Sequence, residues 1–210
     1  AKDYVDIIKK YDAVRKGGLL DGMRKMKNTF SRVYLDHLFY LDFYSIERFG
    51  KTKLGKTLLY AKQSQDKAMI KELVKEIKPG IKGLINKYNI DMVGFIPPTV
   101  KREVQLMKEL ENNLDLKISK IDITKIKTPV IVPQKTLSKL EDRIENAKMT
   151  FIVSEKVFCK NILLIDDAVG SGATLNEIAA QIKEKGIAKG KVIGLAITGS
   201  IKGFDVISEV

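Results

Sequence analysis

Fifteen consecutive residues read Asn161-Ile-Leu-Leu-Ile-Asp166-Asp167-Ala-Val-Gly170-Ser171-Gly172-Ala173-Thr174-Leu175. The apolar run before Asp166 predicts a buried strand, and the spacing of apolar residues from Thr174 onward predicts a helix. Ligands of open α/β sheets bind beyond the carboxyl ends of the strands, where Asp166 and Asp167 are expected to emerge. We therefore expect a strand, a ligand-binding loop and a helix of an α/β fold.

Small residues fill the loop between this strand and this helix. Residues 170–173 allow backbone amides to approach an anion closely, and the N-terminus of the next helix adds its positive end. Ser171 and Thr174 add hydroxyl donors, while the carboxylates of Asp166 and Asp167 suit ribose hydroxyls or a hydrated magnesium ion. The alternative is an ordinary glycine-rich turn before a helix capped by Thr174, but it gives the two adjacent acids no packing role.

Further short apolar runs predict buried strands, at residues 92–96, 130–132, 151–153, 162–165 and 192–197. Helical patterns separate them, at residues 99–112, 137–148 and 174–185. Buried strands that alternate with crossover helices imply a largely parallel sheet. The predicted fold class is α/β with a mostly parallel sheet.

The first 88 residues have a different pattern. It predicts a short helix, a strand or hairpin, and two longer helices with Pro79-Gly80 as the break between them, at residues 3–15, 38–49, 54–77 and 81–88. Helices are thus expected before the first buried strand. The predicted domains are an N-terminal helical and hairpin cap, residues 1–88, and an α/β core, residues 89–210.

Composition narrows the class of protein. A chain of 210 residues with 44% hydrophobic content can bury one sizeable core. No apolar run approaches the roughly 20 residues that span a bilayer, and the N-terminus has no signal-peptide core, so we expect a cytoplasmic protein without a membrane span. One cysteine, Cys159, and one histidine, His37, offer no ligand set for structural zinc. We interpret Cys159 as a core or edge residue and His37 as structural.

The basic charge is concentrated in the first part of the chain. The net charge is +12, and residues 1–90 contain 20 basic and 10 acidic side chains against 18 and 16 afterwards. Such an excess can attract nucleic acid or another polyanion. The lysines are dispersed, so a solvated lysine-rich surface explains the charge equally well.

The fifteen-residue stretch resembles the phosphoribosyl-pyrophosphate signature of type I phosphoribosyltransferases, in which two acids precede a small, hydroxyl-rich phosphate loop. The resemblance implies a type I phosphoribosyltransferase core, 5-phosphoribosyl-1-pyrophosphate (PRPP) as ligand, Mg2+ as cofactor and a role in nucleotide metabolism. It assigns ribose hydroxyls and magnesium to Asp166 and Asp167. It assigns the 5'-phosphate to Gly170, Ser171, Gly172, Ala173 and Thr174.

Similarity outside this stretch points to the ComF (competence protein F) type within that superfamily. Phe95-Ile96-Pro97-Pro98-Thr99 followed by Arg102 is similar to the family's proline-containing strand end with its downstream arginine. A second segment resembles the family's glutamine, arginine and asparagine segment, with Gln134, Arg143 and Asn146. The cysteine-rich zinc module common at that family's N-terminus is absent from this sequence.

The resemblance also implies two further groups of binding residues. Pyrophosphate is assigned to Thr99, Lys101 and Arg102. A mobile hood that closes over the substrate is assigned to Gln134, Lys135 and Arg143. The alternatives are an exposed charge at a helix start for Arg102 and a lysine-rich surface loop for the hood.

A second motif competes with this interpretation. Gly50-Lys-Thr-Lys-Leu-Gly55-Lys56-Thr57 satisfies the nucleotide P-loop pattern. A P-loop follows a buried parallel strand, yet residues 45–49 carry charges and alternate as in a surface hairpin. We favour a hairpin turn that leads into a basic helix.

Three functions remain open. One is an enzyme that transfers the phosphoribosyl group to a nitrogenous base or related acceptor. Another is a non-catalytic PRPP-binding protein that contacts single-stranded DNA through its basic N-terminal part during uptake. The third is a P-loop nucleoside triphosphatase using Gly50 to Thr57. The sequence leaves open the acceptor, the turnover and the oligomeric state, a homodimer included.

Overall fold

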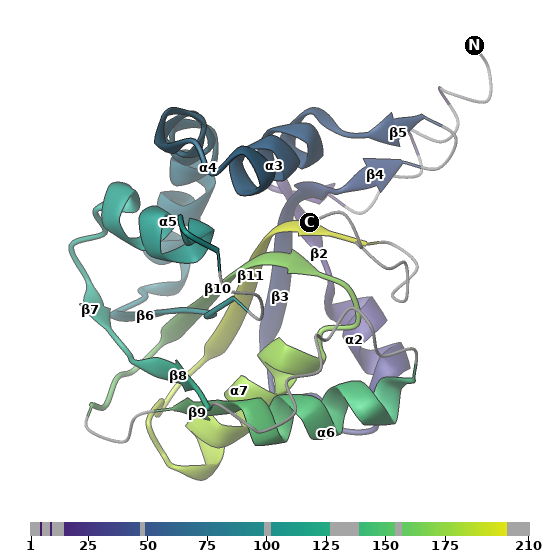
Figure 1. Ribbon diagram of the computed structural model, residues 1–210. Helices are drawn as coiled ribbons and strands as arrows, with labels where there is room; N and C mark the ends of the chain where they lie inside the picture. Colours follow the sequence, from purple (N-terminus) through teal and green to yellow (C-terminus); the bar gives the residue numbers. More distant parts are fainter. Residues whose placement is uncertain are drawn as a thin grey trace.

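The computed structural model describes residues 5, 9, 15–46, 49–98, 102–126, 139–153 and 157–200. A seven-stranded sheet forms its centre, in the order β1-β2-β3-β11-β10-β6-β7 (Figure 1). Five neighbouring strands are parallel: β3 (His37–Phe43), β11 (Val192–Gly199), β10 (Ile162–Val169), β6 (Met92–Phe95) and β7 (Ser119–Lys120). At the β3 edge, β2 (Leu19–Asp21) and β1 (Arg15–Lys16) continue the sheet antiparallel. The predicted α/β class with a mostly parallel sheet is confirmed.

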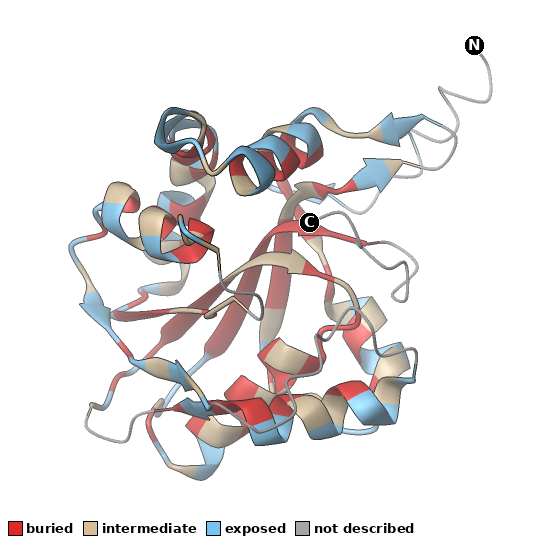
Figure 2. Ribbon diagram, in the orientation of Figure 1, coloured by how far each residue is buried: buried red, intermediate tan, exposed pale blue. Residues whose placement is uncertain are grey.

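Helices cover both faces of this sheet (Figure 1). One face carries α3 (Lys53–Ser64), α4 (Lys67–Tyr88) and α5 (Leu106–Leu114). The other carries α2 (Met23–Thr29), α6 (Leu140–Thr150) and α7 (Ala173–Glu184). Successive side chains of a strand point to opposite faces, so Leu163 joins the core under α3–α5 and Leu164 the core under α7. The central strands are therefore buried on both faces and have continuous apolar sequences (Figure 2).

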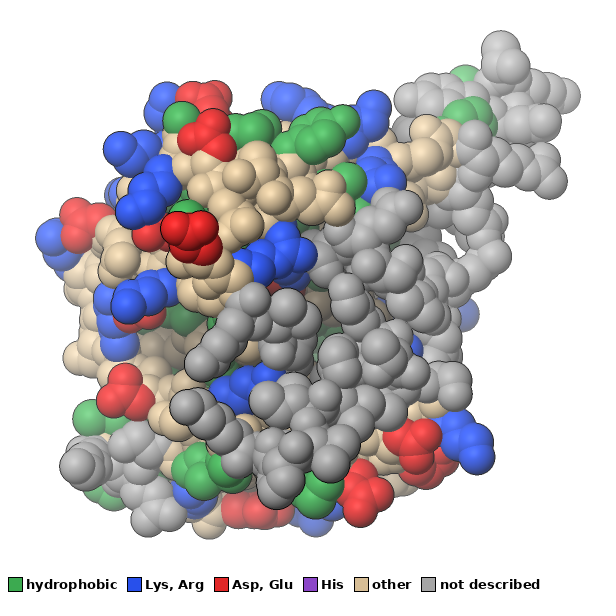
Figure 3. Space-filling model, viewed as in Figure 1, with side chains coloured by type: hydrophobic (Ala, Val, Ile, Leu, Met, Phe, Trp, Pro, Cys, Tyr) green, Lys and Arg blue, Asp and Glu red, His purple; other side chains and the backbone are tan. Residues whose placement is uncertain are grey.

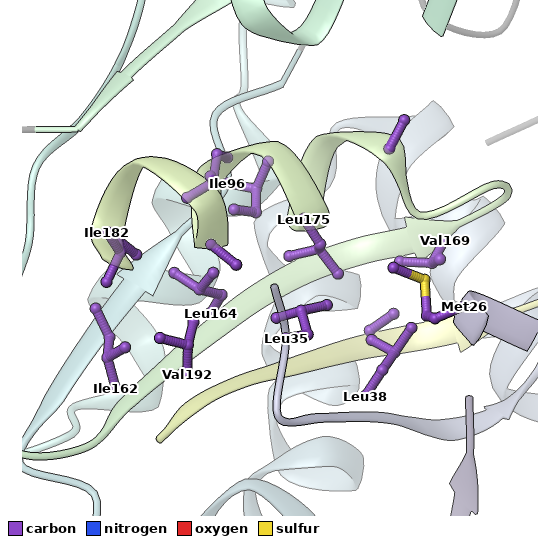
Figure 4. Close-up of a cluster of buried hydrophobic side chains, with 14 of the residues drawn as sticks. Met26, Leu35, Leu38, Ile96, Ile162, Leu164, Val169, Leu175, Ile182 and Val192 are labelled. Atoms are coloured by element: carbon purple, nitrogen blue, oxygen red, sulfur yellow. The ribbon is translucent and has the colours of Figure 1, made fainter. Parts of the chain in front are cut away.

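The core under α7 extends as far as the loop that follows β10. Leu175 and Ile182 of α7 lie over Ile162 and Leu164 of β10, and all four are fully buried (Figure 4). Each such side chain contributes about 1.5–3 kcal/mol of burial free energy. Met26 of α2, also fully buried, lies beside Val169 at the end of β10. The core thus packs against the candidate phosphate loop through Met26 and Val169.

The predicted helix break at Pro79-Gly80 is wrong. α4 continues through Pro79, although an interior proline removes one backbone hydrogen bond. Six buried residues between Ile70 and Leu84 hold this helix against the sheet and offset that loss. The boundary lies earlier, where Gln65 adopts a left-handed conformation with φ 55° and the carboxylate of Asp66 accepts a hydrogen bond from the Ala68 backbone N–H.

The predicted order of helices before the first buried strand is also wrong. β3 lies inside the sheet, between β2 and β11, and Leu38, Phe39 and Tyr40 are buried. The sheet therefore joins strands from both sides of residue 88. The predicted buried strand at residues 151–153 does not join the main sheet: it forms β9 (Phe151–Val153), which pairs antiparallel with β8 (Ile123–Lys125). Ile152 is exposed, so this strand has only one apolar face to bury.

Some expectations fall on residues outside the described ranges. These are the strand at residues 130–132 and most of the helix at residues 3–15. Cys159 is buried, as interpreted, and burial raises the pKa of its thiol to about 11. His37 packs against Tyr88, with ring centroids 5.0 Å apart. None of the described helices is long and apolar enough to cross a membrane.

A matched pair of glycine substitutions tests the helix packing. Gly55 of α3 abuts β3, and a Cβ atom there would overlap the main-chain oxygen of Tyr44. We expect Gly55→Ala to lower the free energy of unfolding by about 2 kcal/mol, because overpacking costs about 1–3 kcal/mol. Gly83 of α4 is exposed, and a Cβ atom there would meet no described atom within 4 Å apart from its chain neighbours and the nearby backbone of α4. Gly83→Ala should raise stability by about 0.5–1 kcal/mol. Urea unfolding measures both, and effects of equal sign would contradict the packing argument.

Candidate functional site

Asp166 and Asp167 lie in the second half of β10 rather than in the loop after it. β10 pairs with β6 only as far as Ile165 and Phe95, whereas it pairs with β11 as far as Val169 and Gly199. The acids therefore lie where β6 has ended and the segment after β6 begins. This is the carboxyl-terminal side of the sheet, as predicted, although the acids lie within β10 and not beyond its end.

The carboxyl group of Asp166 is in an unusual environment. Burial raises its pKa well above the ordinary value, the charge of Asp167 raises it further, and Lys62 opposes the shift. Its Oδ1 accepts a hydrogen bond of 2.8 Å from the backbone N–H of Asp167, which also opposes the shift. An acid perturbed by burial and by a specific charged neighbour is typical of a functional site.

Asp167 forms an ion pair with a residue that the sequence analysis did not identify. The Nζ atom of Lys62, in the last turn of α3, lies 2.6 Å from Oδ2 of Asp167. The side chains are only 17% and 15% exposed. Lys62 follows the fully buried Leu58 by four residues, on the face of α3 that packs on the sheet. A lysine on the buried face of a helix needs an acidic partner. The helical spacing of Lys62 from Leu58 was therefore the sequence signal that could have identified it.

The segment after β6 is joined to the end of α3. The guanidinium of Arg102 donates to the main-chain oxygen of Lys62, and the backbone N–H of Val104 donates to Oε1 of Gln65 at 3.0 Å. These contacts hold residues 102–105 in a non-helical conformation, so α5 begins at Leu106. The predicted helix from residue 99 is therefore wrong over residues 102–105. Thr99 and Lys101 lie outside the described residues.

Residues 170–172 form the turn between β10 and α7, and Ala173 and Thr174 are the first residues of the helix. Gly172 is the N-cap of α7 with φ 89°, a conformation that favours glycine. Ser171 is buried, and its Oγ accepts a hydrogen bond of 3.3 Å from the backbone N–H of Ala173. The first turn of α7, which is fully described and includes Thr174, contains no acidic residue to oppose an anion. The predicted sequence of strand, small-residue loop and helix is confirmed.

Two cationic side chains adjoin this turn. Lys25 of α2 donates to the main-chain oxygens of Gly170 and, at 2.9 Å, Ser200. Arg143 of α6 is buried, and its Nη1 lies 3.7 Å from the position of a Cβ on Gly170. Burial lowers the pKa of the Arg143 guanidinium. Arg143 was predicted in the hood, whereas Lys25, on a short helix far away in sequence, was missed. The other hood residues, Gln134 and Lys135, lie outside the described residues.

The rival P-loop motif does not form a phosphate loop. Its first residues form β5 (Gly50–Lys51), which pairs antiparallel with β4 (Ser45–Ile46). Thr52 caps α3, its side chain accepting a hydrogen bond from the Gly55 backbone N–H, and the helix begins at Lys53. The residues that would surround a phosphate are thus strand or helix. The interpretation as a hairpin leading into a basic helix is confirmed.

The basic charge of the N-terminal part is largely spread over helix surfaces. α4 has five lysines along one face, Lys67, Lys71, Lys75, Lys78 and Lys82. Glutamates pair with some of them, Glu72 with Lys75 at 3.0 Å and Glu109 with Lys67 at 3.5 Å. In the coloured part of Figure 3, blue and red side chains are interspersed over α4 and α5.

Comparisons with known proteins identify similar structures only. No protein-family model and no curated protein matches the chain. A hypoxanthine-guanine phosphoribosyltransferase from Bacillus anthracis is 14% identical with a TM-score of 0.41, covering 67% of this chain and 74% of that one. A hypoxanthine phosphoribosyltransferase from Staphylococcus aureus is 14% identical with a TM-score of 0.38, covering 63% and 66%. Likenesses at this level establish neither an activity nor a substrate for this chain.

Proposed function

We propose that the chain is a type I phosphoribosyltransferase that binds PRPP with Mg2+ and transfers the phosphoribosyl group to a nitrogenous base or related acceptor, releasing pyrophosphate. One observation carries this proposal: the strand that holds the acidic pair leads directly into the turn at residues 170–172 and α7. Cationic side chains adjoin both the turn and the acids. A ligand with anionic ends and a hydroxyl-rich centre suits this arrangement.

The 5'-phosphate is assigned to the turn before α7. Backbone amides of Gly170 to Thr174 and the hydroxyl of Thr174 would donate to its oxygens, and the N-terminus of α7 favours its charge. The buried guanidinium of Arg143 lies close enough to Gly170 to add a charge-assisted hydrogen bond. Lys25 donates a hydrogen bond to the main-chain oxygen of Gly170 and so fixes the position of the turn.

The ribose and Mg2+ are assigned to Asp166 and Asp167. Carboxylates accept hydrogen bonds from ribose hydroxyls, and one or two carboxylates together with substrate phosphates are a common environment for Mg2+. Among the described residues no group of three His, Cys, Asp or Glu side chains could hold a metal ion. Asp166 and Asp167 fit an ion that takes its remaining ligands from pyrophosphate and water, because Mg2+ commonly binds through one or two carboxylates. When bound, such an ion supplies positive charge that stabilises the leaving pyrophosphate.

The protein's part in the reaction is mainly positioning and electrostatics. An acceptor nitrogen forms a bond to C1 of the ribose while the bond from C1 to the pyrophosphate oxygen breaks, and positive charge develops on the sugar. Asp166 and Asp167 orient the ribose, and Arg102 with Thr99 and Lys101 is proposed to bind the departing pyrophosphate. Gln134 and Lys135 are proposed to exclude water by closing over the substrate, whereas Arg143, predicted with them, is buried on α6 and is assigned to the 5'-phosphate.

The lysines along α4 favour a second candidate function. It is a PRPP-binding protein without turnover that contacts single-stranded DNA during uptake, as the ComF resemblance implies. Release of pyrophosphate in the presence of a base would separate the enzyme from this binding protein. DNA affinity that falls steeply with salt would favour the second candidate.

Thermal unfolding with PRPP, and separately with ATP, each with and without Mg2+, tests the proposed ligand. A ligand at about 100 times its Kd stabilises the native state by about 2.7 kcal/mol, which corresponds to roughly 5 °C or more in Tm. We expect PRPP with Mg2+ to give such a shift and ATP to give none. Stabilisation by ATP alone would contradict the proposal.

A further inference from the structure

Lys62 touches two parts of the candidate site at once. Its side chain contacts the acidic centre, with Nζ 2.6 Å from Oδ2 of Asp167. Its main-chain oxygen accepts a hydrogen bond from Arg102, in the segment assigned to pyrophosphate. Lys62 therefore joins a residue assigned to the ribose to a residue assigned to the leaving group.

Packing alone does not account for a lysine at this position. The side chain is 17% exposed and follows Leu58 and Ala61, both buried, on the inner face of α3. An aliphatic residue would fill this space without removing a charge from water, which is costly even when the charge is paired. The cation is more readily explained by an anionic ligand at this end of the site.

We propose that Lys62 is a ligand-binding residue: it pairs with Asp167 in the free protein and moves to the diphosphate when ribose hydroxyls occupy Asp167. This inference rests on the proposed function. A diphosphate with several negative charges competes well with the single charge of Asp167 for the ammonium group. The flexible stem of lysine carries three donors and permits this exchange, while the bond from Arg102 keeps the end of α3 in place.

The exchange makes Lys62 specific for one end of the ligand. Lys25 and Arg143 adjoin Gly170, at the end assigned to the 5'-phosphate, whereas Lys62 pairs with Asp167 and its main-chain oxygen accepts from Arg102, which is assigned to the pyrophosphate. Loss of Lys62 should thus weaken ligands that carry a diphosphate at C1. It should spare ribose 5-phosphate, which has only a hydroxyl there.

Calorimetric titration of Lys62→Gln with PRPP and with ribose 5-phosphate, each with Mg2+, tests this inference. We expect PRPP affinity to fall about 10- to 100-fold, as for loss of a charge-assisted hydrogen bond. Ribose 5-phosphate affinity should stay within about threefold, because the residues assigned to its phosphate and to its ribose hydroxyls are unchanged. Lys62→Arg should recover most of the PRPP affinity. Lys56→Gln, at an exposed position of the same helix, is the matched control and should change neither affinity.

A second comparison applies if Lys62→Gln does not fold. Asp167→Asn keeps the ammonium group, and Lys62→Gln with Asp167→Asn replaces both partners, so no charge of this pair is left buried and unpaired. Inorganic pyrophosphate with Mg2+ is the probe, and the double variant should bind it about 10-fold or more weakly than the single variant. Equal binding of pyrophosphate by both would overturn the role of Lys62.

The failures of the two proposals are distinguishable. If the wild type binds PRPP and folded Lys62→Gln loses affinity for both ligands equally, or for neither, only the inference on Lys62 is overturned. If the wild type binds neither PRPP nor ribose 5-phosphate, the proposed function fails, and the inference fails with it.

Discussion

Asp166→Asn combined with Asp167→Asn is expected to lower PRPP affinity by about 100-fold or more, since each lost charge-assisted hydrogen bond to a hydroxyl costs about 1.5–3 kcal/mol. The two side chains are the only adjacent acids on β10 and lie where β6 stops pairing. Asparagine retains their size and can still accept hydrogen bonds, so the loss reports charge rather than shape. Titration calorimetry with PRPP and Mg2+ measures the effect.

The double variant is expected to remain folded because the two substitutions act on stability in opposite directions. Asp166→Asn removes a carboxylate whose pKa is raised, first by burial and then by the charge of Asp167. Asp167→Asn removes the partner of Lys62 and leaves a mostly buried ammonium group. Neither change touches the apolar core beneath β10.

The pH dependence of the single Asp166→Asn variant checks this reasoning. Because the pKa of Asp166 is raised, the folded state binds its proton more tightly than the unfolded state does. The contribution of Asp166 to the stability of the wild type is therefore greatest below the unfolded pKa of about 3.9, and it falls as pH rises through the folded pKa. Asparagine does not titrate, and the stability advantage of the variant should grow over that range in urea unfolding. Asp122→Asn, at an exposed position, is the control.

The binding test of the double variant has its own contrary outcome. If Asp166→Asn with Asp167→Asn is folded and binds PRPP with unchanged affinity, the assignment of the site to these two residues is contradicted.

Gly172→Ala should have the second large effect, a loss of about 2–4 kcal/mol in the free energy of unfolding. Gly172 has φ 89°, where a residue with a side chain is strained by about 1–3 kcal/mol. A Cβ atom would also lie 2.5 Å from Sδ of the fully buried Met26, and such overpacking costs a further 1–3 kcal/mol or so. The turn would shift away from α2, so PRPP binding should weaken as well.

Gly170→Ala, in the same turn, is the matched control. Its φ is not in the left-handed region, and its added methyl group would meet Nη1 of Arg143 at 3.7 Å, an ordinary van der Waals contact. We expect a stability change within about 0.5 kcal/mol, as for substitutions without strain or burial. Urea unfolding of both variants gives the comparison. Equal losses in the two variants would show that neither the conformation of Gly172 nor Met26 determines the effect.

Local patterns were sufficient where one element carries its own signal. Ile162 to Ile165 form a strand that is buried on both faces, and such strands have continuous apolar sequences in any parallel sheet. The adjacent acids, the small residues of the turn and the helical spacing of α7 are contiguous, so the sequence predicted their order and the edge of the sheet at which they lie. The hairpin before α3 was predicted in the same way, from the alternation of residues 45–49.

Local patterns failed where the outcome depended on a partner far away in sequence. β3 is a central strand because β11, from the other end of the chain, pairs with it, and the same residues could equally have formed a surface hairpin. α4 passes through Pro79 because its buried face packs on the sheet. The contact of Lys62 with Asp167 spans 105 residues, and that of Lys25 with Gly170 spans 145. Periodicity shows which face of an element is apolar, but only strand order and helix placement determine what that face meets. The acidic pair and the small-residue turn were therefore readable from the sequence, whereas the cations beside them became visible only in the tertiary structure.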